Sequence, residues 1–218
     1  MLTLSEEIVL LAIDERAGAL MLLPERSLDF ALSGAMMIEL SMRGKIATVD
    51  DVFLKVLNRD STGDKILDEA LSLIPSSPHL TIENALARIA RKGESWVSKT
   101  FQSLVEKDVL EKKESHFLWL LRESSFHVKD HNLLDGLRLH IRDVIINESI
   151  EPDTREIALI SLMDACKISF TIFSDDELAK YSERFEEITK KDPIARAVSF
   201  AISEIENAIL EVIAFTGV

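Results

Sequence analysis

One segment constrains the fold of this chain more than any other. In residues 27–43, apolar side chains extend around most of the circumference of a predicted helix. A surface helix has a single apolar stripe, so this pattern predicts a helix enclosed by other elements. Gly44 is placed to end the helix in a left-handed conformation, and Gly34 and Ala35 allow a neighbour to approach closely. We therefore expect a central, deeply buried helix with other helices around it.

Helical signals continue through most of the chain. Thr3 and Glu6 have the spacing of a capping box, in which each side chain satisfies a backbone amide at the start of a helix. Residues 45–48 and 52–57 alternate well enough to predict two short strands joined around residues 50–51. Helices are expected at about residues 3–13, 66–74, 81–93, 95–105, 133–147, 152–168, 174–190 and 193–215.

The composition agrees with a helical fold. Seven glycines and five prolines are few for 218 residues, which disfavours a turn-rich β-sandwich. No internal repeat, low-complexity segment or composition break divides the chain. We expect a mainly α fold, in which residues 1–218 form a single helical globular domain with one or two short peripheral β-hairpins.

The segment from residue 95 to residue 122 has a second interpretation. An amphipathic helix is followed by Val109 and Leu110, a charged turn at residues 111–114 and an apolar strand at residues 116–121. A helix followed by a hairpin is also how a winged-helix domain ends. The apolar strand could pack against this protein's own helices, join subunits or enter a bilayer interface, although the charged turn argues against the last use. The residues concerned are Phe117, Leu118, Trp119, Leu120 and Leu121.

Signals for catalysis or metal binding are weak. Cys166 lies in an apolar run and is interpreted as a core residue, and a chain with one cysteine forms no internal disulfide, which fits a reducing compartment. The glycines form no phosphate-binding loop, and no nucleophile elbow occurs. His127 and His131 are four residues apart but straddle a predicted loop-to-helix boundary. We expect no enzymatic activity, no cofactor and no metal.

The charge distribution limits the classes of partner. The formal charge of −13 disfavours attraction to nucleic acid or to an anionic bilayer unless the basic residues gather on one face. One segment, residues 88–105, has four basic residues against a single acid, Glu94. It predicts either a solvated helix face or an anion site. Residues 1–12 lack the basic flank of a signal peptide, and no apolar run reaches membrane-spanning length, so we expect a soluble cytoplasmic protein.

Several blocks in order along the chain resemble the Golgi phosphoprotein 3 family. They are Leu-Thr-Leu-Ser-Glu-Glu-Ile-Val-Leu-Leu at residues 2–11, the block at 34–46, Gly-Asp-Lys-Ile-Leu-Asp-Glu-Ala-Leu at 63–71 and Leu-Val-Glu-Lys-Asp-Val-Leu at 104–110. The resemblance covers most of the chain and is densest before residue 111. Eukaryotic members bind phosphatidylinositol-4-phosphate and use the hairpin region for oligomerisation and, by proposal, for membrane contact. The resemblance therefore implies a binding module.

The positions of the family's lipid site can be aligned with this chain, but the residues at those positions differ. Family members present a tryptophan and an arginine before the block at 34–46 and further arginines before the block at 104–110. Gap-free alignment places Pro24, Ser33, Glu94 and Val97 there, and none matches. A phosphate monoester requires convergent guanidinium or ammonium donors. The nearest replacements, which could form a shifted site for an anionic phospholipid headgroup, are Arg26, Arg91, Lys92 and Lys99.

The resemblance implies a non-enzymatic, phosphoinositide-binding-like adaptor that associates reversibly with membranes, recruits protein partners and could form a homo-oligomer. The alternative is a protein-interaction or scaffolding module without a lipid ligand, for which the acidic surface and the predicted hairpin suffice. A third interpretation is a winged-helix nucleic-acid binder. The net charge argues against it, and so does a predicted recognition helix whose expected outer positions offer only one cation, Lys99.

Overall fold

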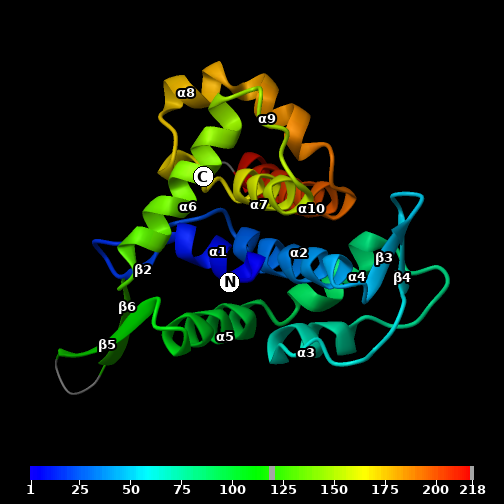
Figure 1. Ribbon diagram of the computed structural model, residues 1–218, viewed down its shortest axis with the longest axis horizontal. Helices are drawn as coiled ribbons and strands as arrows, with labels where there is room; N and C mark the ends of the chain where they lie inside the picture. Colours follow the sequence, from blue (N-terminus) through cyan, green and yellow to red (C-terminus); the bar gives the residue numbers. More distant parts are fainter. Residues whose placement is uncertain (118–120, 217–218) are drawn as a thin grey trace.

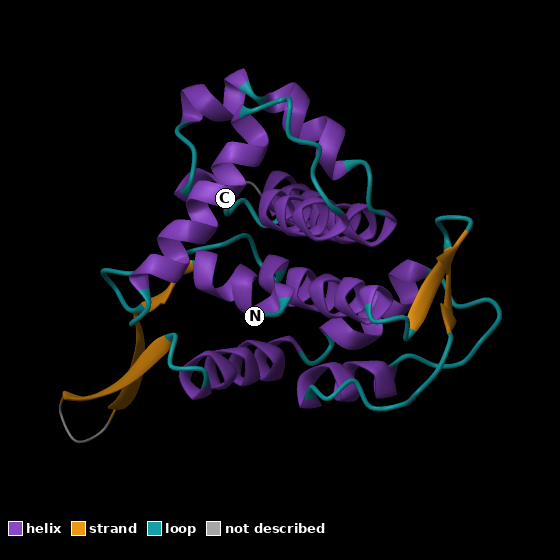
Figure 2. Cartoon of the chain, viewed as in Figure 1, coloured by secondary structure: helices purple, strands orange, loops and turns teal. Residues whose placement is uncertain are grey.

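The structure, a computed structural model, describes residues 1–117 and 121–216, apart from the side chains of residues 114–124, 206 and 208–218. Helices dominate this part of the chain, and the strands form short antiparallel pairs at its periphery (Figure 2). The prediction of a mainly α fold is therefore confirmed. The helices are α1 (Leu4–Leu11), α2 (Ser27–Met42), α3 (Lys65–Leu73), α4 (Ile82–Ala90), α5 (Gly93–Glu106), α6 (His131–Ile146), α7 (Thr154–Ala165), α8 (Asp175–Lys180), α9 (Ser182–Thr189) and α10 (Pro193–Thr216). The strands are β1 (Ile13–Asp14), β2 (Ala19–Leu20), β3 (Ile46–Val49), β4 (Phe53–Val56), β5 (Leu110–Phe117) and β6 (Leu121–Val128), and a short 3-10 helix spans Ser169–Thr171.

Helix α2 is the centre of the fold, as its apolar circumference predicts. It packs against α1, α3, α4, α5, α7 and α10, and Figure 1 shows it between α3 and α5 on one side and α7 and α10 on the other. A Cβ atom added at Gly34 would lie 2.4 Å from Val198 Cγ2 and 3.1 Å from Leu162 Cδ2, so α10 and α7 approach α2 closely at this glycine. Gly44, with φ of 63°, follows the helix as predicted.

Partly buried ion pairs join the first helices of the chain to α7. The Arg155 guanidinium on α7 lies 2.8 Å from a carboxylate oxygen of Glu7 and 3.2 Å from one of Glu39, and it donates a hydrogen bond of 2.7 Å to the Leu2 carbonyl. Burial raises the pKa of Glu7, and this effect outweighs the opposing effect of Arg155. These contacts hold α1 and α2 against α7.

The described residues form three short hairpins instead of the predicted one or two, because β1 and β2 also pair, as strands of two residues each. The predicted pair is present as β3 and β4, with Asp50 and Asp51 both at positive φ, as in a type I′ turn. Strand β4 also contacts the chain on its other side, where the Leu54 amide donates to the Leu80 carbonyl at 2.8 Å.

The hairpin of β5 and β6 differs from the prediction. Residues 111–114 belong to β5, which pairs with β6 up to Phe117 and Leu121, so the charged residues are part of a strand. The predicted turn at 111–114 is therefore wrong. Glu111, Lys112 and Lys113 are exposed, and a ribbon open to solvent accepts charged side chains. The side chains from Phe117 to Leu121 lie outside the described part, so their use stays a prediction.

Two helix boundaries also differ. Pro152 precedes α7 instead of lying in its first turn, because the capping box that opens this helix is formed by Asp153 and Glu156. The predicted helix at 174–190 is divided into α8 and α9 at Tyr181. Near this break the Ser182 hydroxyl donates to the Ala179 carbonyl at 3.0 Å, a side-chain bond that competes with the regular helical bond.

Candidate anion-binding site

Arg26 lies where two distant segments of the chain meet. It precedes α2 in a left-handed conformation, with φ of 59°, and its guanidinium lies 5.3 Å from the centre of the Phe30 ring. One guanidinium nitrogen donates to the Ala90 carbonyl at 3.4 Å, and Nε lies 3.5 Å from an oxygen of Asp29. These contacts bring the start of α2 against the link between α4 and α5.

This junction forms a hollow of about 410 Å³. Three of the four candidate cations line it together, so sequence reasoning selected residues that do converge. Among the described residues, none forms an ion pair or a side-chain hydrogen bond with the exposed Arg91. The residues lining the hollow are Arg26, Asp29, Ala90, Arg91, Lys92, Gly93, Glu94 and Ser95.

Asp29 is the residue of this hollow that sequence reasoning missed. A Cβ atom added at Gly93 would lie 2.0 Å from Asp29 Cγ, so only glycine at the first position of α5 leaves room for the carboxylate. Burial raises the pKa of Asp29, while the charge of Arg26 acts in the opposite direction. Asp29 follows Arg26 by three residues, about one helical turn, and this spacing is the local signal that could have suggested Asp29.

The fourth candidate, Lys99, lines a separate hollow of about 540 Å³ but is linked to Lys92 through Glu69 of α3. The Lys92 Nζ atom lies 2.9 Å from one Glu69 oxygen, and Lys99 pairs with the other oxygen. Hydrogen bonds from Lys99 and Lys92 lower the pKa of Glu69. Sequence reasoning missed Glu69, because nothing local places α3 beside α5.

The positions implied by the family resemblance are close by. Pro24, Glu94 and Val97 line an apolar groove of about 820 Å³, which shares Arg26, Asp29 and Glu94 with the cationic hollow. Ser33 is different, since it is fully buried in α2 and its hydroxyl donates to the Asp29 carbonyl at 2.7 Å. The fold thus brings three of the four family positions together, with side chains that do not bind phosphate.

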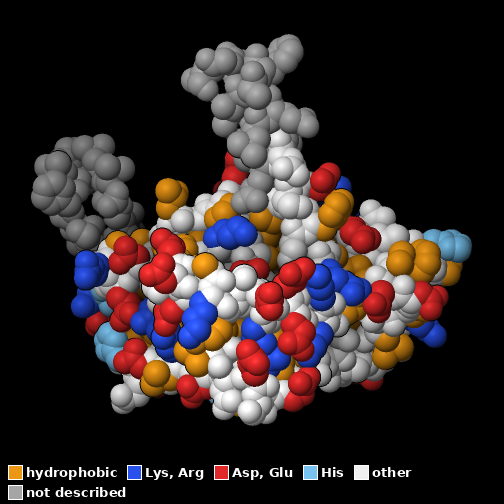
Figure 3. All heavy atoms as spheres, turned by 90° about the horizontal axis from the view of Figure 1, so that it is seen from above, with side chains coloured by type: hydrophobic (Ala, Val, Ile, Leu, Met, Phe, Trp, Pro, Cys, Tyr) orange, Lys and Arg blue, Asp and Glu red, His pale blue; other side chains and the backbone are white. Residues whose placement is uncertain are grey.

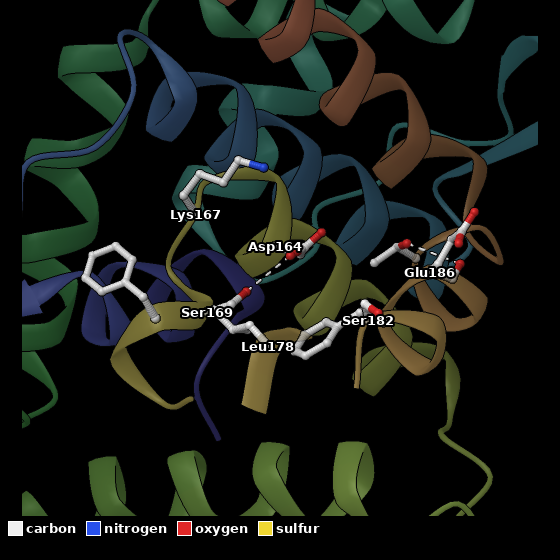
Figure 4. Close-up of a pocket in the computed structure, with 9 residues that line it drawn as sticks. Asp164, Lys167, Ser169, Leu178, Ser182 and Glu186 are labelled. Atoms are coloured by element: carbon white, nitrogen blue, oxygen red, sulfur yellow. Dashed lines mark hydrogen bonds between the residues drawn. The ribbon is translucent and has the colours of Figure 1, made fainter. Parts of the chain in front are cut away.

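A further hollow, of about 460 Å³, lies between the end of α7 and helices α8 and α9 (Figure 4). Lys167, Leu178 and Glu186 contribute to its walls, and Phe170, which also lines it, is 52% exposed. The α7–α8 hollow combines apolar surface with charges of both signs.

On the molecular face seen in Figure 3, acidic and basic side chains are interspersed.

Metal and thiol chemistry has little support in the described part of the chain. Within it, no group of three or more His, Cys, Asp or Glu side chains is placed to hold a metal ion. His127 lies in β6, whereas His131 begins α6 and lies 3.2 Å from Glu15. Cys166 is fully buried, as predicted, and burial raises the pKa of its thiol to about 12. Across the same described residues, no helix is both long and apolar enough to cross a membrane.

Comparison with known proteins gives concordant matches. The sequence model described as Golgi phosphoprotein 3 (GPP34) matches residues 4–205. The protein named vacuolar protein sorting-associated protein 74 of Eremothecium gossypii is 29% identical over 178 residues, which cover 72% of this chain and 53% of that protein. The protein of the same name from Schizosaccharomyces pombe is 25% identical over 174 residues, covering 70% and 50% respectively. The chain thus spans about half the length of these relatives.

Proposed function

The chain belongs to the Golgi phosphoprotein 3 family, and we propose that it binds anionic lipid headgroups as a non-enzymatic peripheral membrane adaptor. The observation that carries this proposal is the hollow lined by Arg26 at the start of α2 and by Arg91 and Lys92 of the link between α4 and α5. A phosphate monoester carries close to two negative charges, and convergent guanidinium and ammonium groups are the donors that bind it. Phosphatidylinositol-4-phosphate is the headgroup that the family resemblance implies.

The acids of the hollow determine what kind of binding we expect. Asp29 and Glu94 lie among the three cations and oppose an incoming phosphate. Binding should therefore be weak for an isolated headgroup and should depend on the negative potential of a membrane surface. This expectation fits a protein that associates with membranes reversibly and is cytoplasmic between binding events.

The adaptor part of the proposal rests on the relatives. Both are named for vacuolar protein sorting, and we propose a comparable role for this chain in recruiting protein partners at a membrane. We also propose that residues 1–218 act as one domain, because α2 packs against helices from both ends of the described chain.

Vesicle sedimentation tests the lipid site. The parent protein should sediment with phosphatidylcholine vesicles that contain phosphatidylinositol-4-phosphate, and Arg26→Gln combined with Arg91→Gln should weaken this binding about 30-fold, since each cation contributes about 1 kcal/mol near an anionic membrane. Arg16→Gln combined with Lys55→Gln removes the same charge from other exposed positions and is the matched control. Equal losses in both double variants would show that only the overall charge matters.

The second candidate function is a protein-interaction or scaffolding module without a lipid ligand. It is favoured by the apolar groove beside the cationic hollow and by the exposed Phe170 at the α7–α8 hollow. Absence of vesicle binding by the parent would favour this function. A nucleic-acid partner is not proposed, because Glu94 and Glu106 lie on the exposed face of α5, where a recognition helix would need cations.

A further inference from the structure

Two ammonium groups of α5 converge on one carboxylate of α3. Lys92, at the N-cap of the helix, and Lys99, two turns later, each pair with a different oxygen of Glu69. Trp96 lies between the two lysines in sequence, and their Nζ atoms lie 5.9 Å and 5.0 Å from the centre of its ring. The Trp96 side chain is fully buried, and its indole nitrogen donates a 2.8 Å hydrogen bond to the Ile89 carbonyl. The tryptophan thus gives both lysines a fixed apolar support.

This geometry resembles the one that a phosphate requires. Two oxygens of a single anionic group each accept a hydrogen bond from a different lysine, as two oxygens of a phosphate monoester would. Glu69 supplies that anion from within the protein, and its side chain is 30% exposed, so solvent reaches the bridge. In the free protein, Glu69 therefore offsets part of the positive charge of Lys92 and Lys99.

Lys92 connects the bridge to the proposed lipid site. The same side chain lines the hollow that contains Arg26 and Arg91, while Lys99 lines the hollow on the other side of Glu69. While Lys92 pairs with Glu69, the negative charge of that carboxylate weakens the attraction of Lys92 for any other anion. Release from Glu69 would make Lys92 a second uncompensated donor for an anion, beside Arg91, while Arg26 pairs with Asp29.

We propose that Glu69 is an internal counter-ion that restrains Lys92 and Lys99, and that a phosphorylated lipid headgroup displaces it from these two ammonium groups on binding. This inference rests on the proposed function and adds its regulation. A phosphate monoester competes effectively with a carboxylate because it carries nearly twice the charge and has more acceptor oxygens. The affinity of the site is therefore set by competition between an internal and an external anion.

Glu69→Gln tests the competition, because glutamine retains the shape of the side chain and removes its charge. On phosphatidylcholine vesicles that contain phosphatidylinositol-4-phosphate, this variant should bind about fivefold more tightly than the parent, which is the effect of about one additional cation near the membrane. Glu186→Gln is the matched control, since Glu186 is an exposed partner of Lys190 on α9 and its replacement changes the net charge equally. A Glu69→Gln, Lys92→Gln, Lys99→Gln triple variant should lose the gain.

The outcomes separate this inference from the proposed function. Equal binding by Glu69→Gln and Glu186→Gln would overturn the counter-ion role, while the lipid site would stand if Arg26→Gln with Arg91→Gln still weakened binding. Binding by Glu69→Gln alone, without binding by the parent, would support the inference. No binding by any variant would overturn both proposals. Inorganic phosphate added as a competitor identifies the source of the anion: if it abolishes the gain at concentrations comparable to the lipid, the site recognises free phosphate and the lipid assignment is wrong.

Discussion

Replacement of Gly34 by alanine tests the close crossing on which the packing of α2 depends. The added Cβ would lie 2.4 Å from Val198 Cγ2, at least 1 Å closer than an ordinary carbon contact of about 3.5 Å. Overpacking of this kind costs about 1–3 kcal/mol, whereas alanine gains up to about 1 kcal/mol in helix propensity over glycine. We expect a net loss of up to about 2 kcal/mol for Gly34→Ala and a larger loss for Gly34→Leu, whose longer side chain places more atoms in the same crowded space.

A double-mutant cycle with Val198→Ala makes this test specific. Val198 Cβ lies 3.7 Å from the added atom, so alanine at both positions leaves an ordinary contact with α10. Val198→Ala alone should cost about 2 kcal/mol through lost burial and the space it leaves. The double variant should be more stable than the sum of the single losses by about 1 kcal/mol or more, as measured by chemical denaturation. Additive losses in this cycle would refute the crossing at this residue.

Two further predictions concern the α3 loop and the hairpin. Hydrogen bonds from the Ser61 hydroxyl and from the Thr62 amide and hydroxyl lower the pKa of Asp68 to about 2, so its contribution to stability is present above pH 4 and is lost as the pH falls towards 2. Asp68→Asn should therefore melt at a lower temperature than the parent at pH 6, and the two melting temperatures should converge near pH 2. Replacing Trp119 and Leu121 together by serine should lower either the melting temperature or the mass measured by light scattering; a variant unchanged in both, with weaker vesicle binding, would assign these residues to the membrane instead.

The elements that could be predicted are those specified by local patterns. The apolar circumference of residues 27–43 identified the central helix, and the capping box of Thr3 and Glu6 located the start of α1. The β5 strand was misassigned because a cluster of charges is typical of a turn, although an exposed ribbon accepts it equally well. The division of the 174–190 helix at Tyr181 has no signal in the apolar periodicity.

The candidate site was predictable only in its cations. Arg91, Lys92 and Lys99 stand out because they interrupt an acidic sequence within a few residues of one another. Glu69 could not be recognised, because its role depends on tertiary structure that brings its side chain from α3 to the lysines of α5, and one glutamate among many acids carries no distinguishing signal. Sequence reasoning therefore identified the cations and missed the carboxylate that pairs with Lys92 and Lys99.

The packing of α2 against α10 has a consequence for the synthesis of the protein. The central helix leaves the ribosome early, but Pro193, the first residue of α10, follows Met42 by 151 positions. At roughly 5–20 residues per second, the apolar face of α2 that receives Val198 stays uncovered for about 8–30 s while the intervening chain is made. During that interval the nascent chain exposes an apolar surface beside Gly34. We therefore expect ribosome-bound intermediates that end before α10 to recruit chaperones, and release from them to coincide with the emergence of this helix.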